Sequence, residues 1–208
     1  MVSIDVSSSG RKYLLIIAPL ILLVALTVAV DFVELSPGDD QPEPKAPDPT
    51  ALDHCRTISS PGEYVLTDDF GGATGLASSC LVINSSDVRI NGSGHTLLGR
   101  GVTDSTGIVV DNESGVSNVT IHSVRVERWN RAIHLRNASD VTIRNASTVR
   151  SATGITVWNG TDVTVKNTWI SRNLFGVVAD NRSERVNLTA ARYGDNSAAN
   201  STRGTGEV

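Results

Sequence analysis

The sequence lacks several features that enzymes and nucleic-acid-binding proteins usually carry. After Val30 no segment has the hydrophobic period of an amphipathic helix, which argues against a helical or alternating α/β fold. There is no glycine-rich phosphate loop, and no nucleophile stands in a recognisable arrangement with a histidine and an acid. Beyond the first 30 residues, 16 basic residues stand against 21 acidic ones, so nucleic acid is not an expected partner.

One long apolar run lies near the N-terminus, over residues 13–30. It carries no charge, follows Arg11 and Lys12, and precedes several acidic residues. A helix needs about 20 apolar residues, and at least about 17, to cross a bilayer. The basic flank predicts a cytoplasmic N-terminus over residues 1–12. We therefore expect residues 13–30 to be a transmembrane anchor at the cell membrane, with a cleaved signal peptide as the alternative. In both cases the rest of the chain is exported.

A spacer and a pair of cysteines follow the apolar run. Residues 36–51 are rich in proline and aspartate, with almost nothing apolar, which predicts a semi-extended linker over residues 31–51. Cys55 and Cys80 are the only cysteines. In an exported chain an even count predicts a disulfide, although two free thiols are the alternative.

The second half of the chain repeats itself every 22 residues. Four aliphatic residues of one copy map onto four of the next: Ile133, Leu135, Val141 and Ile143 onto Ile155, Val157, Val163 and Val165. With small insertions the pattern also fits two upstream copies and one downstream copy, which makes about five. Each copy alternates apolar and polar residues in short β-branched runs, as strands with one buried face do. A single copy cannot bury its aliphatic face, but stacked copies can. We predict an all-β, right-handed parallel β-helix of about five coils.

The stretches "CRTISSPGEYVLTDDF" and "VRINGSGHTLLG" carry a family resemblance. They resemble the opening of parallel β-helix repeat proteins, the pectate-lyase-like and NosD-like groups, as found in exported proteins of halophilic archaea. The resemblance implies an N-terminal cap over residues 52–80 and coils over 81–199, followed by a flexible tail over 200–208. It says little about activity, because this scaffold carries many functions.

Residues one period apart in such a stack lie in a column, about 4.8 Å from their neighbours. One column, before the second strand of each coil, holds Asp87, Asn118, Asp140 and Asp162. Turn chemistry explains it, because Asp and Asn side chains accept backbone N–H bonds. Calcium held by adjacent carboxylates is the alternative. We expect no metal site and no other cofactor.

Two further columns are basic. One holds Arg128, Arg150 and Arg172, and the other holds His122, Arg144 and Lys166. Like charges this close repel by about 1 kcal/mol per pair in water. Either the columns form a solvated face, or their guanidinium groups bind the carboxylates or sulfates of an acidic polysaccharide. Trp129, Trp158 and Trp169 are candidate platforms for sugar rings, and Trp158 is preferred because it stands at an outward position. The candidate ligand-binding residues are Arg128, Arg150, Arg172, Arg144, Lys166 and Trp158.

Glycosylation sequons are abundant. Ten of the 14 asparagines begin N-x-[ST]: Asn84, Asn91, Asn112, Asn118, Asn137, Asn145, Asn159, Asn181, Asn187 and Asn200. Five of them fall in one turn of the coil, where glycans about 5 Å apart would collide. We therefore expect some of the sites to be used, but not all ten.

Three classes of function are open. The first is an anchored surface module, structural or polysaccharide-binding, without identifiable catalytic residues. The second is a polysaccharide lyase or hydrolase, which the pectate-lyase resemblance implies and for which Asp140, Asp162 and the arginine column are candidates. The third is copper handling as in NosD-like proteins, but the four histidines, His54, His95, His122 and His134, form no close set. His134 is expected to be exposed. An uncovered last coil also predicts self-association at the C-terminal end.

Overall fold

The structure is a computed structural model that describes residues 47–72, 78–101 and 103–203. The predicted membrane segment at residues 13–30 lies outside these residues, as does most of the linker. Within the described ranges, no helix has the length and apolar character needed to span a bilayer. The domain described below is the compact unit that begins at Pro47.

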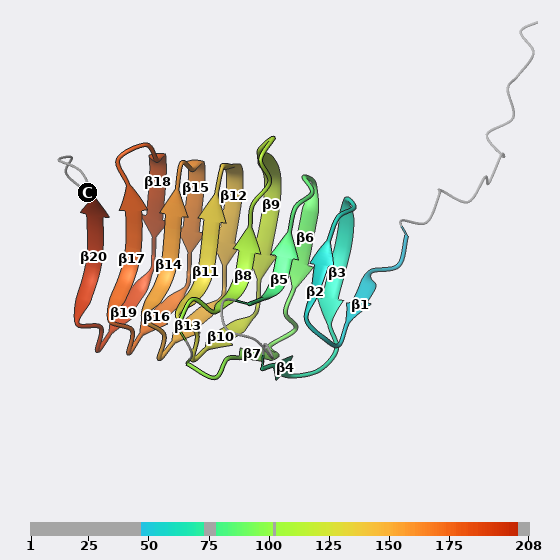
Figure 1. The fold of residues 1–208 in the computed structure, drawn as a ribbon, viewed down its shortest axis with the longest axis horizontal. Coiled ribbons are helices and arrows are strands. Elements are labelled where there is room, and N and C mark those ends of the chain that lie inside the picture. Colours follow the sequence, from blue (N-terminus) through green and yellow to red (C-terminus); the bar gives the residue numbers. More distant parts are fainter. Residues whose placement is uncertain (1–46, 73–77, 102, 204–208) are drawn as a thin grey trace, which may run out of the picture. The chain divides into compact units, whose positions relative to one another are not determined.

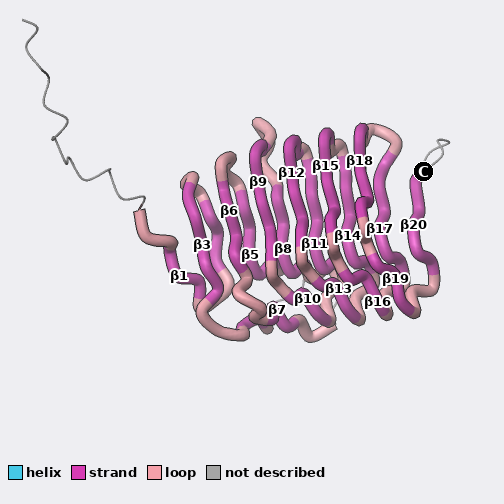
Figure 2. The backbone as a smooth tube through the Cα atoms, turned by 180° about the vertical axis from the view of Figure 1, so that it is seen from behind, coloured by secondary structure: helices cyan, strands magenta, loops and turns pink. Residues whose placement is uncertain are grey.

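The domain is a stack of strands in three parallel sheets (Figures 1 and 2). Sheet A contains β1 (Thr50–Leu52), β3 (Gly62–Leu66), β6 (Val88–Asn91), β9 (Val116–His122), β12 (Ala138–Arg144), β15 (Thr161–Lys166) and β18 (Glu184–Thr189). Sheet B contains β2 (Arg56–Ile58), β5 (Ser79–Ile83), β8 (Thr106–Val110), β11 (Arg131–Arg136), β14 (Thr153–Trp158), β17 (Phe175–Asp180) and β20 (Ala198–Arg203). Sheet C contains β4 (Phe70–Gly71), β7 (Thr96–Leu98), β10 (Arg125–Glu127), β13 (Ser147–Val149), β16 (Trp169–Ser171) and β19 (Arg192–Gly194).

The chain visits sheet B, then sheet A, then sheet C in every turn of the stack. Six complete turns begin with β2, β5, β8, β11, β14 and β17, one more than the five or so predicted. The additional turn is β2–β4, which lies in the segment that the sequence assigns to the N-terminal cap. Its strands are short and its sequence departs from the 22-residue template, so the repeat pattern did not reveal it.

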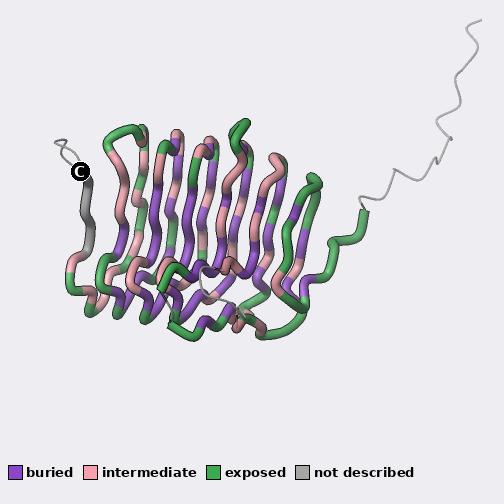
Figure 3. Tube along the Cα trace, viewed as in Figure 1, coloured by how far each residue is buried: buried purple, intermediate pink, exposed green. Residues whose placement is uncertain are grey.

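The 22-residue register is confirmed. Ile133 pairs with Ile155 and Leu135 with Val157 in sheet B, while Val141 pairs with Val163 in sheet A. The upstream and downstream copies align at the predicted positions as well. These aliphatic side chains are fully buried in the middle coils and form the core (Figure 3). Each contributes roughly 1.5–3 kcal/mol by burial.

Four residues at or near the start of the sheet A strands adopt a left-handed backbone. Asp87, Asn118, Asp140 and Asp162 have φ between 51° and 58°. Asp and Asn tolerate this conformation better than most residues. Asn118 donates from Nδ2 to Asp87 Oδ1 at 2.7 Å. The backbone thus agrees with the turn interpretation of this column. In the ranges that the structure covers, no cluster of three His, Cys, Asp or Glu side chains is arranged to hold a metal ion.

The predicted disulfide is confirmed. Cys55 and Cys80 are bonded, with their Cα atoms 4.4 Å apart. Cys55 precedes β2 and Cys80 lies in β5, so the bond ties together the first two turns of the stack.

Trp129 is buried rather than exposed, so its candidacy as a sugar platform is wrong. Its Nε1 donates to the carbonyl oxygen of Leu97 at 2.9 Å, and the side chain is 2% exposed. A Cβ atom at Gly99 would lie 2.6 Å from the indole, and one at Gly107 would lie 3.2 Å from it. Two glycines therefore leave room for the ring inside the corner between sheets C and B.

Candidate functional site

The outer face of sheet C and the turn that follows it hold a group of charged side chains. Arg128, Arg150 and Arg172 come directly after β10, β13 and β16, and all three are exposed. Backbone bonds link successive turns here, from Arg128 N to Val149 O and from Arg150 N to Ser171 O. The predicted arginine column is therefore confirmed as a column. We call these three residues the arginine turn.

The backbone at the arginine turn does not favour arginine. The three residues have φ of 63°, 52° and 55°. A left-handed conformation costs a non-glycine residue roughly 1–2 kcal/mol, and asparagine or glycine relieves that cost. Other turns of the stack do use Asn or Asp at such positions, including Asn137, Asn159 and Asp195. The backbone conformation therefore does not account for arginine at three successive turns. We attribute the choice of arginine to its guanidinium side chain.

The other predicted ligand residues lie elsewhere. Arg144 and Lys166 do form a column with His122, at the carboxyl ends of the strands of sheet A. That column borders the edge of sheet C opposite to the arginine turn. Trp158 ends β14 in sheet B, on a different face. The predicted set therefore comprises three separate surfaces.

A charged cluster that the sequence analysis missed lies beside the arginine turn. Glu127 accepts hydrogen bonds from Arg125 Nε and from Arg150 Nη1, both at 2.8 Å, and its side chain is 11% exposed. Burial alone would raise the pKa of Glu127, but the hydrogen bonds and positive charges of Arg150 and Arg125 outweigh burial and hold that pKa below its usual value. The cluster thus fixes two guanidinium groups on the face and keeps the carboxylate between them ionised.

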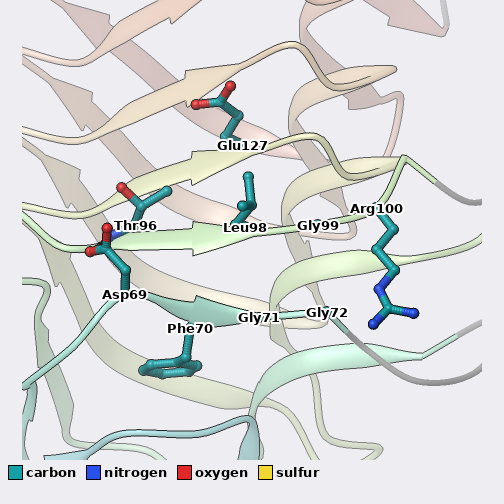
Figure 4. Close-up of a pocket in the computed structure, with 9 residues that line it drawn as sticks. All are labelled: Asp69, Phe70, Gly71, Gly72, Thr96, Leu98, Gly99, Arg100 and Glu127. Atoms are coloured by element: carbon teal, nitrogen blue, oxygen red, sulfur yellow. Dashed lines mark hydrogen bonds between the residues drawn. The ribbon is translucent and has the colours of Figure 1, made fainter.

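A pocket of about 450 Å³ opens on the N-terminal half of this face (Figure 4). Its lining includes Asp69, Phe70, Leu98, Arg100 and Glu127. In the close-up, Asp69 and Thr96 lie at one end and Arg100 at the other, with Leu98 between them. Leu98 is 47% exposed, so the floor of the pocket is apolar while its ends are charged.

Asp69 orients a histidine at one end of the pocket. Asp69 Oδ1 accepts the backbone N–H of Thr96 at 2.8 Å and lies 3.1 Å from His95 Nδ1. The hydrogen bond from Thr96, followed by that from His95, lowers the pKa of Asp69. Both carboxyl groups of the pocket therefore favour the ionised form and are poor general acids.

The face is positive although the protein is acidic. Six guanidinium groups lie on sheet C or in the turn after it: Arg100, Arg125, Arg128, Arg150, Arg172 and Arg192. Five carboxylates accompany them, on the sheet or in the turns beside it: Asp68, Asp69, Asp104, Glu127 and Asp195. Arg172 lies 3.9 Å from Asp195, whereas Arg128 forms no ion pair with any described residue. The chain has a net charge of −4, but this face carries more guanidinium groups than carboxylates. Its local positive charge suits an anionic partner.

Trp158 belongs to a separate cluster on the outer face of sheet B. Its ring meets the ring of His134 edge-on, with centroids 4.7 Å apart, and the guanidinium of Arg131 lies 5.4 Å from the Trp158 centroid. His134 is only 5% exposed, so the expectation of an exposed histidine is wrong. Burial, reinforced by the charges of Arg131 and Arg136, lowers the pKa of His134 to about 4. Its Nε2 is buried and bonds to no described residue.

The acids proposed for hydrolysis are engaged in structural contacts. Arg185 Nη2 donates to Asp162 Oδ2 at 2.8 Å, and hydrogen bonds from Arg185 lower the pKa of Asp162. Asp140 lies within β12, one coil away, with a left-handed backbone. Asp162 is therefore held by Arg185 in a contact between adjacent turns of the stack.

Three parallel sheets wound in one continuous coil make the described domain a right-handed parallel β-helix, which confirms the expected fold. Residues 106–202 match the family model described as right handed beta helix region. No curated protein matches the chain significantly in sequence.

Two solved structures resemble the domain. One is the A-module of the Azotobacter vinelandii mannuronan C-5 epimerase AlgE4, at 14% identity and a TM-score of 0.49, over 72% of this chain and 54% of that one. The other is the A-module of AlgE6 from the same organism, at 15% identity and a TM-score of 0.42, over 72% and 49%. The chain thus spans about half the length of both structures.

Proposed function

We propose that the domain binds acidic polysaccharide on the outer face of sheet C, without catalysing a reaction on it. The arginine turn carries this proposal, because it places three exposed guanidinium groups in one column along the stack, at positions where the backbone favours other residues. Guanidinium groups pair with carboxylates and sulfates in a planar, two-bonded geometry. A linear polyanion lying along the column would meet one of these groups at every turn.

The neighbouring residues support binding more than catalysis. Glu127 holds Arg125 and Arg150 in place, and the apolar floor at Leu98 offers a surface for the C–H faces of sugars. The carboxyl groups of Asp69 and Glu127 both have lowered pKa values, so neither is suited to protonate a glycosidic oxygen. An export signal or membrane anchor, surface location and self-association belong to the same proposal as expectations from the sequence.

Affinity electrophoresis in gels containing a polyuronate tests the proposal. The Arg128→Gln, Arg172→Gln double variant should bind about two- to thirtyfold more weakly, since it removes two exposed ion pairs that contribute roughly 0.2–1 kcal/mol each. A matched control, Arg89→Gln with Arg182→Gln, removes the same charge from sheet A and from the β17–β18 loop. Equal weakening in both variants, or no retention of the unmodified protein, would refute the arginine turn as the binding site. Retention should also fall as salt rises.

A lyase activity is the second candidate, and the Asp69–His95 pair favours it. An imidazole held by a carboxylate can act as a base, and the cluster around Glu127 places guanidinium groups nearby to neutralise a uronate. Release of unsaturated sugars from polyuronate, abolished by His95→Gln, would establish this activity. Absence of unsaturated products at high enzyme concentration would leave the non-catalytic proposal.

A further inference from the structure

Asn145 differs in its surroundings from the sequon asparagines whose amides bond within the fold, Asn112, Asn118 and Asn159. It stands in the turn between β12 and β13, is exposed, and has a φ of 49°. Its side chain bonds to no described residue, and the residues above and below it in the column, Ser123 and Asn167, do not begin sequons. A glycan on Asn145 would therefore meet no second glycan in its own column.

Several competing sequons already use their amide groups within the fold. Asn112 donates from Nδ2 to Asn84 O at 2.8 Å, and Asn159 donates from Nδ2 to Asn137 Oδ1 at 2.9 Å. Asn118 donates in the same way to Asp87. A glycosylated amide keeps only one N–H, so a sugar on any of these nitrogens would crowd the bond between turns. At Asn112 and Asn159, glycans on neighbouring sequons in the same turn would also collide.

An exposed aromatic ring lies next to Asn145. Trp169 is 45% exposed, and it lines a hollow of about 360 Å³ together with Asn145, Asn167 and Arg192. A Cβ atom at Gly194 would lie 3.1 Å from the Trp169 ring, so this glycine lets the indole lie close against the sheet. One ring face is thereby supported by the protein. The indole N–H bonds to no described residue.

We propose that Asn145 is an N-glycosylation site and that the first sugars of its glycan pack against Trp169. In the transfer, Asn145 Nδ2 forms a bond to the anomeric carbon of a sugar supplied by a phosphate-activated, lipid-linked oligosaccharide. The bond between that carbon and the phosphate oxygen breaks, the phosphate leaves, and the amide loses one proton. No redox partner is needed.

The packing follows from the chemistry of the hollow. The C–H face of a pyranose covers an indole ring, while the free amide of Asn167 and the guanidinium of Arg192 can bond to its hydroxyl groups. The glycan would cover the edge of sheet C at which Trp169 lies. The arginine turn, at the opposite edge, would stay open, so this proposal does not depend on polysaccharide binding.

Glycopeptide mapping of the full chain, made in a host that exports and N-glycosylates proteins, tests the modification. We expect Asn145 to be occupied and Asn112, Asn118 and Asn159 to be unmodified. The variant Ser147→Ala removes the sequon while keeping Asn145. An unmodified Asn145, alone or with every other site also unmodified, would overturn the proposal.

A double-mutant cycle tests the contact with Trp169. Ser147→Ala should lower the Tm of the glycosylated protein, and it should have no such effect in a Trp169→Ala background. The same four proteins, made in a host without N-glycosylation, measure how the loss of the Ser147 hydroxyl changes the Tm when no glycan is present. This change is subtracted from the effect seen in the glycosylated proteins. An equal effect of Ser147→Ala in both backgrounds would refute the packing of the glycan on Trp169.

Discussion

His134 predicts how the stability of the domain depends on pH. The ring is buried beneath Trp158 with an unbonded Nε2, and burial followed by the charges of Arg131 and Arg136 lowers its pKa from 6.5 to about 4. The folded domain therefore resists protonation, whereas the unfolded chain takes up a proton below about pH 6.5. The contribution of neutral His134 to the free energy of unfolding is fully present above pH 6.5 and is lost as the pH falls towards 4.

The size of the loss follows from the shift. Each pKa unit corresponds to about 1.36 kcal/mol, so a shift from 6.5 to about 4 lowers the free energy of unfolding by about 3 kcal/mol. The pKa of His122 is lowered too, by burial and then by Arg144 and Arg89, and adds to the loss in the same direction. Carboxyl groups such as Glu127 have lowered pKa values and lose their contribution mainly below about pH 4.

Urea unfolding at pH 7.5 and pH 4.5 measures this prediction, with His134→Val as the test variant. The column of His134 already contains Val109 and Val178, so valine fits the outer face of sheet B. Between pH 7.5 and pH 4.5 the free energy of unfolding should fall in both proteins. The fall should be about 2–3 kcal/mol smaller in the variant than in the unmodified protein. His122→Asn serves as the control and should remove only a smaller part of the dependence. Equal pH dependence of His134→Val and the unmodified protein would refute the argument.

Three other substitutions test the fold and the charged cluster. Replacing Cys55 and Cys80 by serine should lower the free energy of unfolding by about 3 kcal/mol, measured by urea unfolding, because the bond closes a loop of 25 residues; an unchanged midpoint would contradict it. Glu127→Gln should cost about 1–3 kcal/mol in the same assay, since two guanidinium groups lose their charged acceptor. Gly154→Ala should cost about 1–3 kcal/mol, because its Cβ would lie 2.7 Å from both Thr148 Oγ1 and a backbone oxygen. A thermal midpoint equal to that of the unmodified protein would refute each of the last two.

The stacked fold was predictable because its pattern is periodic. Buried aliphatic residues must coincide between turns, so pairs such as Ile133 and Ile155 reveal the register by their spacing alone. The arginine column followed from the same shift. The first turn was missed because its strands, two to five residues long, are too short to show the template.

The surroundings of the columns were not predictable from period and alternation. His134 does face outward, but the bulky side chain of Trp158 covers it. The alternation of apolar and polar residues shows which side of a strand a residue is on, but not which neighbouring side chains cover it. Trp129 occupies the corner position that Ser151 and Asn173 occupy in the next two turns, where the chain points inward while changing sheets. Each of these residues directly follows a turn arginine, which is the sequence signal that marks the position.

Trp158 was preferred to Trp169 because the sequence indicates its outward position, whereas the sheet to which Trp169 belongs is known only from the structure. The pairing of β13 with β16 places Trp169 on sheet C. Glu127 was missed because a single acidic residue between arginines reads as ordinary surface charge. Its burial and its two bonded guanidinium groups appear only when adjacent turns are stacked.

Arginine-directed labelling with phenylglyoxal, read out by peptide mass mapping with and without a polyuronate, tests most directly whether the arginine turn is the binding surface. The polymer should protect Arg128, Arg150 and Arg172 together while leaving Arg89 and Arg144 reactive. Protection of Arg144 in place of the arginine turn, or equal reactivity of all five with bound polymer, would contradict the proposed site.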